Sequence, residues 1–173
     1  HARSTDGGHS FSAPRRLVGS MARPARAPSL AVAADGRVHL AYALGDDRDP
    51  ARAEIHVTTS ADGGLSFGNA TVLAPGAPHS DAPRLALGPD GTLHLVHAES
   101  TAGPFAAHRI RYLRSVDRGR RFGTPAVLPL PAGAAGAGFP QLAIGRCGEV
   151  VVAWESWPDS ANGRPRGLGL AVS

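Results

Sequence analysis

Residues 60–67 read Ser60-Ala61-Asp62-Gly63-Gly64-Leu65-Ser66-Phe67, and this pattern occurs three times in the chain. The other copies are residues 4–11, STDGGHSF, and residues 115–122, SVDRGRRF. All three share Ser-x-Asp-x-Gly-x-x-Phe, and the copies begin 56 and then 55 residues apart. Self-similarity at a nearly fixed period is the signature of a repeat architecture, so these copies, called boxes below, organise the fold.

Each box has the chemistry of a tight turn. An Asp-Gly pair between apolar runs favours a turn, because glycine tolerates positive φ and the aspartate can bond nearby backbone N–H groups. The serine hydroxyl can do the same, and the phenylalanine can anchor the turn to an apolar layer. We predict a structural role for twelve box residues: Ser4, Asp6, Gly8, Phe11, Ser60, Asp62, Gly64, Phe67, Ser115, Asp117, Gly119 and Phe122.

Aligning the segments on their boxes reveals four strands in each repeat. The first begins at a proline in Pro-x-Leu-Ala and ends in a glycine turn, and alternating apolar residues mark the next two strands. The box follows the third strand, and a short fourth strand follows the box. The second strands are predicted at 38–42, 93–97 and 150–154, the third at 55–59, 110–114 and 168–172, and the fourth at 14–18, 70–73 and 125–128.

Four antiparallel strands per repeat of about 55 residues predict an all-β fold of β-propeller blades. We expect one propeller segment over residues 1–173, with whole blades at about 28–73 and 83–128. A third blade at 140–173 has three strands of its own, and a strand such as 14–18 is expected to complete it.

The boxes resemble the Asp-box, or BNR, repeat of the sialidase superfamily, with phenylalanine at the aromatic position. The resemblance implies a six-bladed ring, of which this chain supplies about three blades, with the boxes away from the catalytic centre. It also implies an extracellular or periplasmic location.

Sialidases resemble one another in an arginine-rich pocket for the sugar carboxylate, whose first arginine lies in Phe-Arg-Ile-Pro. Arg26, in Ala-Arg-Ala-Pro, occupies that place here, and Asp47 and Asp49 lie where the resemblance implies an acid/base aspartate. A planar guanidinium suits a carboxylate. The alternative is that Arg26 is an ordinary loop residue in an arginine-rich chain, and that Asp47 and Asp49 are solvated carboxylates of a turn.

The family's tyrosine nucleophile has no clear counterpart, because Tyr42 and Tyr112 fall at repeat-equivalent apolar positions that indicate packing. The best local candidates for sugar contacts are aromatic and acidic residues near the ends of the second strands. Tryptophan faces stack on sugar rings, and carboxylates accept bonds from hydroxyls; burial in the core is the competing interpretation. These ligand-binding candidates are Trp154, Glu155, Trp157 and Glu99.

The composition argues against several other classes. The formal net charge is +4 and the pI about 10.5, but all 18 basic residues are arginines spread along the chain. We therefore expect no nucleic-acid partner, and no apolar run is long enough for a membrane span. Neither metal-ligand spacing nor a phosphate-binding glycine loop is present, so no metal or other cofactor is expected.

Two function classes remain open. The sequence favours a non-catalytic module that binds a glycan or protein or serves as a scaffold; the alternative is part of an exo-alpha-sialidase-type glycoside hydrolase. For partners, we expect a glycan or protein ligand, and either a homodimer that closes a six-bladed ring or the missing blades of a longer chain.

Overall fold

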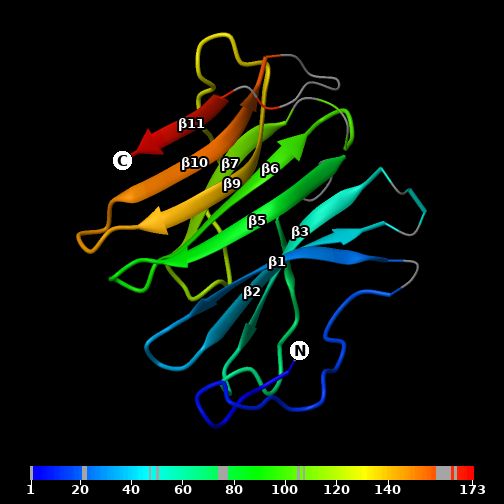
Figure 1. Cartoon of the computed structure of the whole chain (residues 1–173), viewed down its shortest axis with the longest axis vertical. Coiled ribbons are helices and arrows are strands. Elements are labelled where there is room, and N and C mark those ends of the chain that lie inside the picture. The colour runs from blue at the N-terminus through cyan, green and yellow to red at the C-terminus, as the bar shows by residue number, and fades with distance from the viewer. Residues whose placement is uncertain are drawn as a thin grey trace.

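The computed structural model describes residues 2–20, 23–46, 48–49, 51–73, 78–104, 106, 108–158, 165 and 167–173. Within these residues the chain forms eleven strands and no helix, as the repeat pattern predicted (Figure 1). The strands group into three blades, each an antiparallel array in chain order. The chain is therefore an all-β row of three β-propeller blades.

Blades 1 and 2 each have four strands, and blade 3 has three among the described residues. A single parallel bridge between Ala53 and His79 links the sheets of the first two blades. Blade 1 contains β1 (Ala25–Val32), β2 (Val38–Gly45), β3 (Ala53–Ser60) and β4 (Thr71–Leu73); blade 2 contains β5 (His79–Leu87), β6 (Leu93–Ser100), β7 (Arg109–Ser115) and β8 (Ala126–Val127); blade 3 contains β9 (Gly136–Ile144), β10 (Val150–Trp157) and β11 (Gly167–Val172).

Two apolar layers hold the blades together, because alternation along each strand sends every second side chain towards the next blade. The first layer joins blades 1 and 2 through residues such as Ile55, Val57 and Leu95. The second joins blades 2 and 3 through Ile110, Trp154 and their neighbours. The small aliphatic residues of the sequence thus fill the spaces between the sheets.

The first strand of each blade contains a backbone irregularity that the alternation pattern did not predict. Ala27, Ala82 and Phe139 have φ values of 51°, 51° and 48°, and each precedes a proline. The register of the strand pairing shifts at Ala27 and at Ala82, and for Phe139 the shift is on the partner strand β10. Non-glycine residues with positive φ cost about 1–3 kcal/mol each and cluster at functional sites.

The boxes form the predicted turns. In the second box the Ser60 hydroxyl donates to Asp62 (2.6 Å) and accepts from the Gly64 N–H (2.7 Å), while the Ser66 N–H donates to Asp62 (2.9 Å). The first and third boxes repeat these three bonds. Phe122 packs against the core and Phe67 is half-buried, but Phe11 is 66% exposed, so the predicted anchor is present in two boxes only.

The strand predicted at 14–18 does not form within the single chain, because residues 11–18 belong to no sheet. Instead the segment lies beside blade 1: the Arg15 guanidinium donates to the Leu65 carbonyl, and Leu17 lines a cavity with Tyr42. A strand needs a neighbouring edge, and the proline at position 14 lacks a donor. The observed fourth strands, β4 and β8, are themselves only three and two residues long.

Candidate functional site

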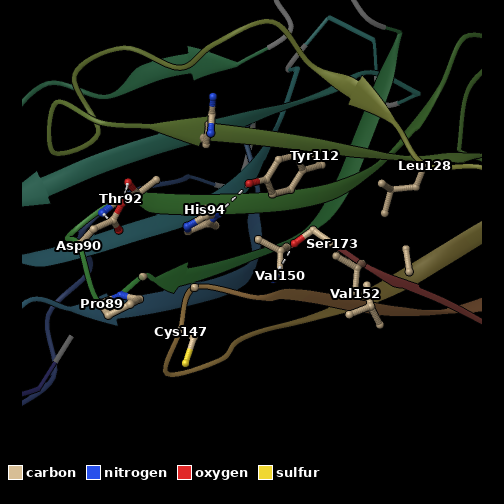
Figure 2. A pocket seen from close by; sticks show the side chains of 15 residues that line it. Pro89, Asp90, Thr92, His94, Tyr112, Leu128, Cys147, Val150, Val152 and Ser173 are labelled. Atoms are coloured by element: carbon tan, nitrogen blue, oxygen red, sulfur yellow. Dashed lines mark hydrogen bonds between the residues drawn. The ribbon is translucent and has the colours of Figure 1, made fainter.

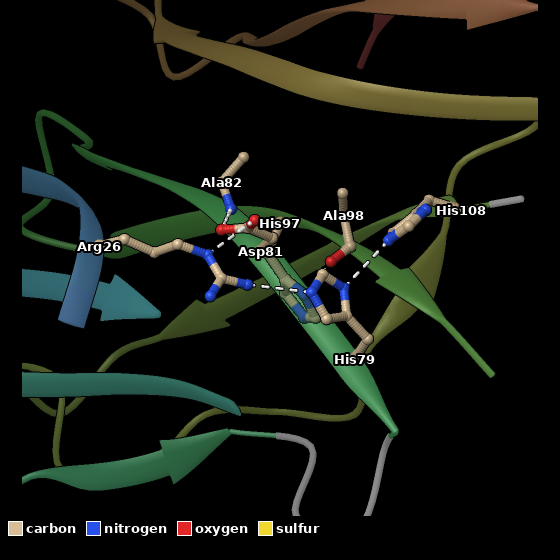
Figure 3. A network of polar contacts seen from close by, with 7 residues as sticks. All are labelled: Arg26, His79, Asp81, Ala82, His97, Ala98 and His108. Carbon is tan, nitrogen blue, oxygen red and sulfur yellow. Dashed lines mark hydrogen bonds and ion pairs between the residues drawn. The ribbon is translucent and has the colours of Figure 1, made fainter. Parts of the chain in front are cut away.

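The beginnings of β1 and β5 carry a polar network that joins two blades (Figure 3). The Arg26 Nε atom lies 3.0 Å from an Asp81 carboxylate oxygen, and an Arg26 terminal nitrogen lies 2.9 Å from His79 Nε2. These residues are 55 and 53 positions apart in sequence. We call Arg26, His79, Asp81 and His108 the strand-start network.

The network continues into blade 3. His79 Nδ1 lies 3.1 Å from His108 Nε2, and His108 Nδ1 lies 2.7 Å from the Ala106 carbonyl oxygen. The Ala137 N–H of β9 donates to the His108 carbonyl at 2.9 Å. Since arginine can only donate, His79 Nε2 must accept; its Nδ1–H then donates to His108, whose Nδ1–H donates to Ala106. The geometry therefore assigns one tautomer to each neutral imidazole.

Electrostatics favour the neutral state of both histidines. Burial lowers the pKa of His79, and the neighbouring His108 lowers it further, while Asp81 opposes the change. Burial also lowers the pKa of His108. A proton on His79 Nε2 would remove the acceptor of the Arg26 bond and place two positive charges in contact. At neutral pH the network consequently holds one ion pair and two uncharged rings.

The backbone bulges explain why Arg26 meets Asp81. Both residues stand immediately before a positive-φ residue, at equivalent positions of neighbouring first strands. The extra residue in each bulge bends the strand and redirects the adjacent side chain. The Asp81 carboxylate also accepts the Ala82 N–H at 2.7 Å. The side chains of Arg26 and Asp81 remain 40% and 31% exposed, so the pair is accessible to a ligand.

The equivalent position in blade 3 carries an aromatic pair. Gly138 is the counterpart of Arg26 and Asp81, and Phe139 follows it with positive φ and 61% exposure. The rings of Phe139 and Trp157 lie 6.2 Å apart and are tilted by 49°. A Cβ atom at Gly138 would stand 3.1 Å from the Trp157 ring, so the glycine makes room for the indole. An apolar surface of this kind suits stacking against a sugar ring.

The four ligand-binding candidates are divided by the structure. Trp154 is only 3% exposed and belongs to the core between blades 2 and 3, which does not fit a ligand contact. Glu99 is 8% exposed, and one of its oxygens lies 2.7 Å from Arg111 Nε. Glu155 is half-buried on β10, opposite Gly138 of β9, while Trp157 borders the exposed Phe139. The sequence therefore predicted one ring of the aromatic pair.

The predicted acid/base candidates lie in the turn between β2 and β3. The Asp49 carboxylate accepts the Ala51 N–H at 3.0 Å, and the carboxylate of Asp46, another residue of this turn, accepts the Arg48 N–H at 2.9 Å. These are local turn bonds of the kind that aspartates often make. Asp47 lies outside the described residues.

Both tyrosines have packing roles in the blades. Tyr42 is 5% exposed and stacks on the His56 ring at 5.5 Å. The Tyr112 hydroxyl lies 2.7 Å from His94 Nδ1. These contacts agree with the interpretation of both residues as packing residues.

A cavity separate from the strand-start network lies between blades 2 and 3, towards the end of the blades that carries the boxes (Figure 2). Its volume is about 590 Å³, with apolar side chains such as Val152 and Leu128 and polar groups from Asp90, His94 and Ser173. Across the part of the chain that the structure describes, no group of three or more His, Cys, Asp or Glu residues is arranged to hold a metal ion. The described residues also include no helix with the length and apolarity needed to cross a membrane.

Sequence reasoning assigned no site role to His79, His108 or Asp81. The sequence did contain one signal for Asp81: an arginine stands two positions before Pro28, and an aspartate stands at the equivalent position before Pro83. Neighbouring repeats place such equivalent positions side by side, so opposite charges there predict an ion pair. The histidines gave no comparable signal, because their contacts depend on how the loop before β7 folds.

No protein-family model matches the sequence, and no curated protein sequence matches it significantly. Solved structures do match in fold. A protein of unknown function from Dyadobacter fermentans has a TM-score of 0.67 at 18% identity, over 89% of this chain and 43% of that one. The Hadza microbial sialidase Hz136 has a TM-score of 0.64 at 15% identity, over 95% and 40% of the two chains.

An alpha-L-arabinanase from Penicillium chrysogenum, complexed with arabinobiose, has a TM-score of 0.55 at 14% identity, over 76% of this chain and 41% of that one. At these identities the likeness concerns the fold alone. This chain spans about two fifths of the length of each of these three proteins. Its blades therefore share the β-propeller fold of these proteins.

Proposed function

We propose that this chain supplies a non-catalytic carbohydrate-binding face, located at the strand-start network and the neighbouring Phe139–Trp157 pair. The observation that carries the proposal is the Arg26–Asp81 ion pair, partly exposed beside a row of equivalent strand beginnings. A guanidinium donates and a carboxylate accepts, so together they match the hydroxyl groups of a sugar. The exposed ring of Phe139 supplies the stacking surface.

The same pair favours a neutral sugar over an acidic one. Asp81 already occupies the Arg26 guanidinium with a 3.0 Å contact, so a ligand carboxylate would compete with it and face its negative charge. A neutral polyol can bond to both partners without separating them. Among proteins of similar fold, one is called a sialidase and another was solved with arabinobiose, and this site fits the neutral class.

The carboxylates near the site support binding without hydrolysis. Glycoside hydrolysis uses two carboxyl groups on either side of the scissile bond. In the described part of the chain, Asp81 is paired with Arg26 and Glu99 with Arg111, and the carboxylates of Asp46 and Asp49 accept backbone N–H bonds. Glu155, opposite Gly138, is the other carboxylate near the site, and one carboxylate does not supply the pair that hydrolysis uses. The alternative function is a sialidase-type hydrolase, and an assay of sialoside turnover distinguishes it from binding without hydrolysis.

Isothermal titration calorimetry with a neutral arabino-oligosaccharide and with sialyllactose tests the proposal. The neutral ligand should bind more tightly, and Trp157→Ala should weaken it by about tenfold. Asp81→Asn, which leaves the guanidinium uncompensated, should weaken the neutral ligand and strengthen the acidic one. Asp35→Asn, a substitution in the exposed turn between β1 and β2, is the matched control. Binding of neither ligand would overturn the carbohydrate assignment.

Turnover of a fluorogenic sialoside tests the non-catalytic part separately. We expect none above background. Turnover that disappears in Arg26→Ala would contradict the proposal and establish the hydrolase alternative.

A further inference from the structure

The third box bridges two blades. It follows β7 of blade 2, but its turn lies against blade 1: a Cβ atom at Gly119 would stand 3.5 Å from both His39 Nδ1 and Thr59 Oγ1. Those two atoms lie 2.9 Å apart and bond to each other. The contact holds the turn on blade 1, and it determines where the residues on either side of Gly119 stand.

Beside this contact lies a cavity of about 360 Å³ between blade 1 and the third box. Blade 1 contributes Thr59 of β3 and Arg37 from the turn between β1 and β2. The third box contributes Arg118 and Arg120, the two neighbours of Gly119. We call it the arginine cavity, because the described residues that line it include three arginines and no acidic residue.

The guanidinium groups of the arginine cavity have few partners. Arg37 donates from one terminal nitrogen to Asp35 at 2.7 Å, and its other guanidinium N–H donors remain for a ligand. Among the described residues, Arg118 and Arg120 form no ion pair and donate no side-chain hydrogen bond. Three like charges around one cavity repel each other, and an anion bound between them would offset that repulsion.

The backbone of Arg118 also supports a role in binding. Its φ is 65°, in the left-handed region that glycine adopts without steric cost. The first two boxes have Gly7 and Gly63 at this position, with φ values of 71° and 69°. Because all three boxes make the same turn bonds, the turn itself does not require an arginine here. Non-glycine residues held at positive φ cluster at ligand-binding and active sites.

We propose that the arginine cavity binds a tetrahedral oxyanion, namely the sulfate or phosphate ester group of a ligand. A guanidinium fork bonds two oxygens of an anion at once. Three such groups supply more donors than the two oxygens of a carboxylate use, whereas the three terminal oxygens of a sulfate or phosphate ester offer one acceptor to each arginine. The cavity is larger than about 300 Å³, the lower end of the range for small-molecule pockets, so part of the molecule that carries the ester fits as well.

The arginine cavity differs from the proposed carbohydrate face in both place and chemistry. The carbohydrate face lies at the strand-start end of the blades, whereas the arginine cavity lies at the box end. The described residues that line the cavity include no aromatic ring on which a sugar could stack. The anion proposal therefore does not rest on the carbohydrate proposal, and the two sites can be occupied independently.

Nitrogen-15 NMR titration of the full chain tests the site with four related probes: glucose 6-sulfate, glucose 6-phosphate, glucuronate and glucose. Both esters should bind saturably and shift the amide signals of Arg118, Gly119 and Arg120. Glucuronate should bind more weakly, and glucose should leave these three signals in place. A phosphate ester gains its second charge near about pH 6, so its affinity should rise between about pH 5 and pH 7.5 while that of the sulfate stays constant. The tighter ester at about pH 7.5 distinguishes a sulfated from a phosphorylated natural ligand.

Substitutions separate a binding role from a structural one. Arg118→Gly and Arg120→Gln should each weaken binding of the esters by at least about tenfold, through loss of charge-assisted hydrogen bonds. Arg118→Gly should also raise the midpoint temperature of unfolding, because glycine relieves the strained backbone. The matched controls should leave the affinity unchanged: Arg121→Gln, in the same box but outside the cavity, and Trp157→Ala, at the carbohydrate face.

Four results would each overturn the proposal. They are no saturable binding of either ester, an affinity for glucuronate equal to that for the esters, an equal loss of affinity in Arg121→Gln, and a lower unfolding temperature for Arg118→Gly.

Discussion

The two ends of the blades are stabilised in different ways. At the box end, each turn bonds within itself, between residues two to four positions apart. At the strand-start end, Arg26, Asp81, His79 and His108 bond across separations of 29 to 55 residues. The box end therefore depends on local turn chemistry, and the strand-start end depends on the correct assembly of three blades.

The acid sensitivity of stability is the largest effect expected at the strand-start end. His97 on β6 is fully buried, and burial lowers its pKa to about 4. As pH falls below about 6.5, the unfolded chain therefore binds the proton first. Stability should be full above that value and should decline by about 3 kcal/mol for this group as pH approaches 4.

Urea unfolding between pH 7.5 and 4 measures this decline. The pKa values of His79 and His108 are also lowered, so they add to the loss in the same direction. His97→Gln should flatten the profile relative to the wild type. A free energy of unfolding that stays constant over this range would contradict the assignment of buried neutral histidines.

Phenylalanine truncation tests the packing difference among the boxes. Phe122 packs against the core, whereas Phe11 is 66% exposed. Phe122→Ala should destabilise the chain by about 2 kcal/mol, below the value for a fully buried ring because Phe122 is only half-buried. Phe11→Ala should cost less than about 0.5 kcal/mol. If thermal and urea unfolding showed that Phe11→Ala and Phe122→Ala lower the free energy of unfolding equally, the first box would be packed as well as the third.

Serine truncation separates the turn bonds from the packing. Ser60 is fully buried and accepts the Gly64 N–H, so Ser60→Ala leaves a buried donor unpaired and should cost about 1–2 kcal/mol. Ser4→Ala removes the same bond from an exposed turn, which can open locally, so global unfolding should change by less than about 0.5 kcal/mol. Hydrogen exchange of the Gly8 and Gly64 amides provides the local measurement. Slow exchange at Gly8 in the Ser4→Ala variant would be inconsistent with this view.

The ion pair between blades should contribute less to stability than the side chain of Phe122 or of Ser60. Arg26 and Asp81 are 40% and 31% exposed, so solvent screens much of their attraction. A double-mutant cycle with Arg26→Gln and Asp81→Asn should yield a coupling of about 0.5 kcal/mol. The control cycle pairs Arg37 and Asp35, an ion pair within one exposed turn. A coupling above about 2 kcal/mol would indicate that the network stabilises the stack rather than serving a ligand.

The box end of the blades could be predicted from the sequence far better than the strand-start end. The boxes, the strand order and the propeller class were predictable, because turn bonds and alternation depend on residues close in sequence. The sequence indicated both Trp154 and Trp157 as ligand candidates, but residues three apart on a strand lie on opposite faces. In the structure Trp154 enters the core, whereas Trp157 lies beside Phe139. The strand-start network was not predicted, because the bulges at Ala27 and Ala82 redirect side chains that simple alternation places elsewhere.

The carboxyl groups of the boxes provide the finest test of local turn chemistry. The Ser10 and Ser66 hydroxyls donate to Asp6 and Asp62, and together with the first serine of each box they lower the pKa of both aspartates far below the usual range. Arg121 occupies this position in the third box and donates only its backbone N–H to Asp117, whose pKa is also lowered.

If turn bonds alone set these values, Asp6 and Asp62 should titrate together by carbon-13 NMR although their boxes differ in packing, and Asp117 should titrate at higher pH. Arg121→Ser should then lower the pKa of Asp117, and Ser66→Ala should raise that of Asp62. Because each pKa is lowered on folding, the associated stability is present above about pH 4 and lost as pH falls. Titration of Asp6 near the usual carboxyl value, with Asp62 still low, would mean that packing on a blade is required to form the turn.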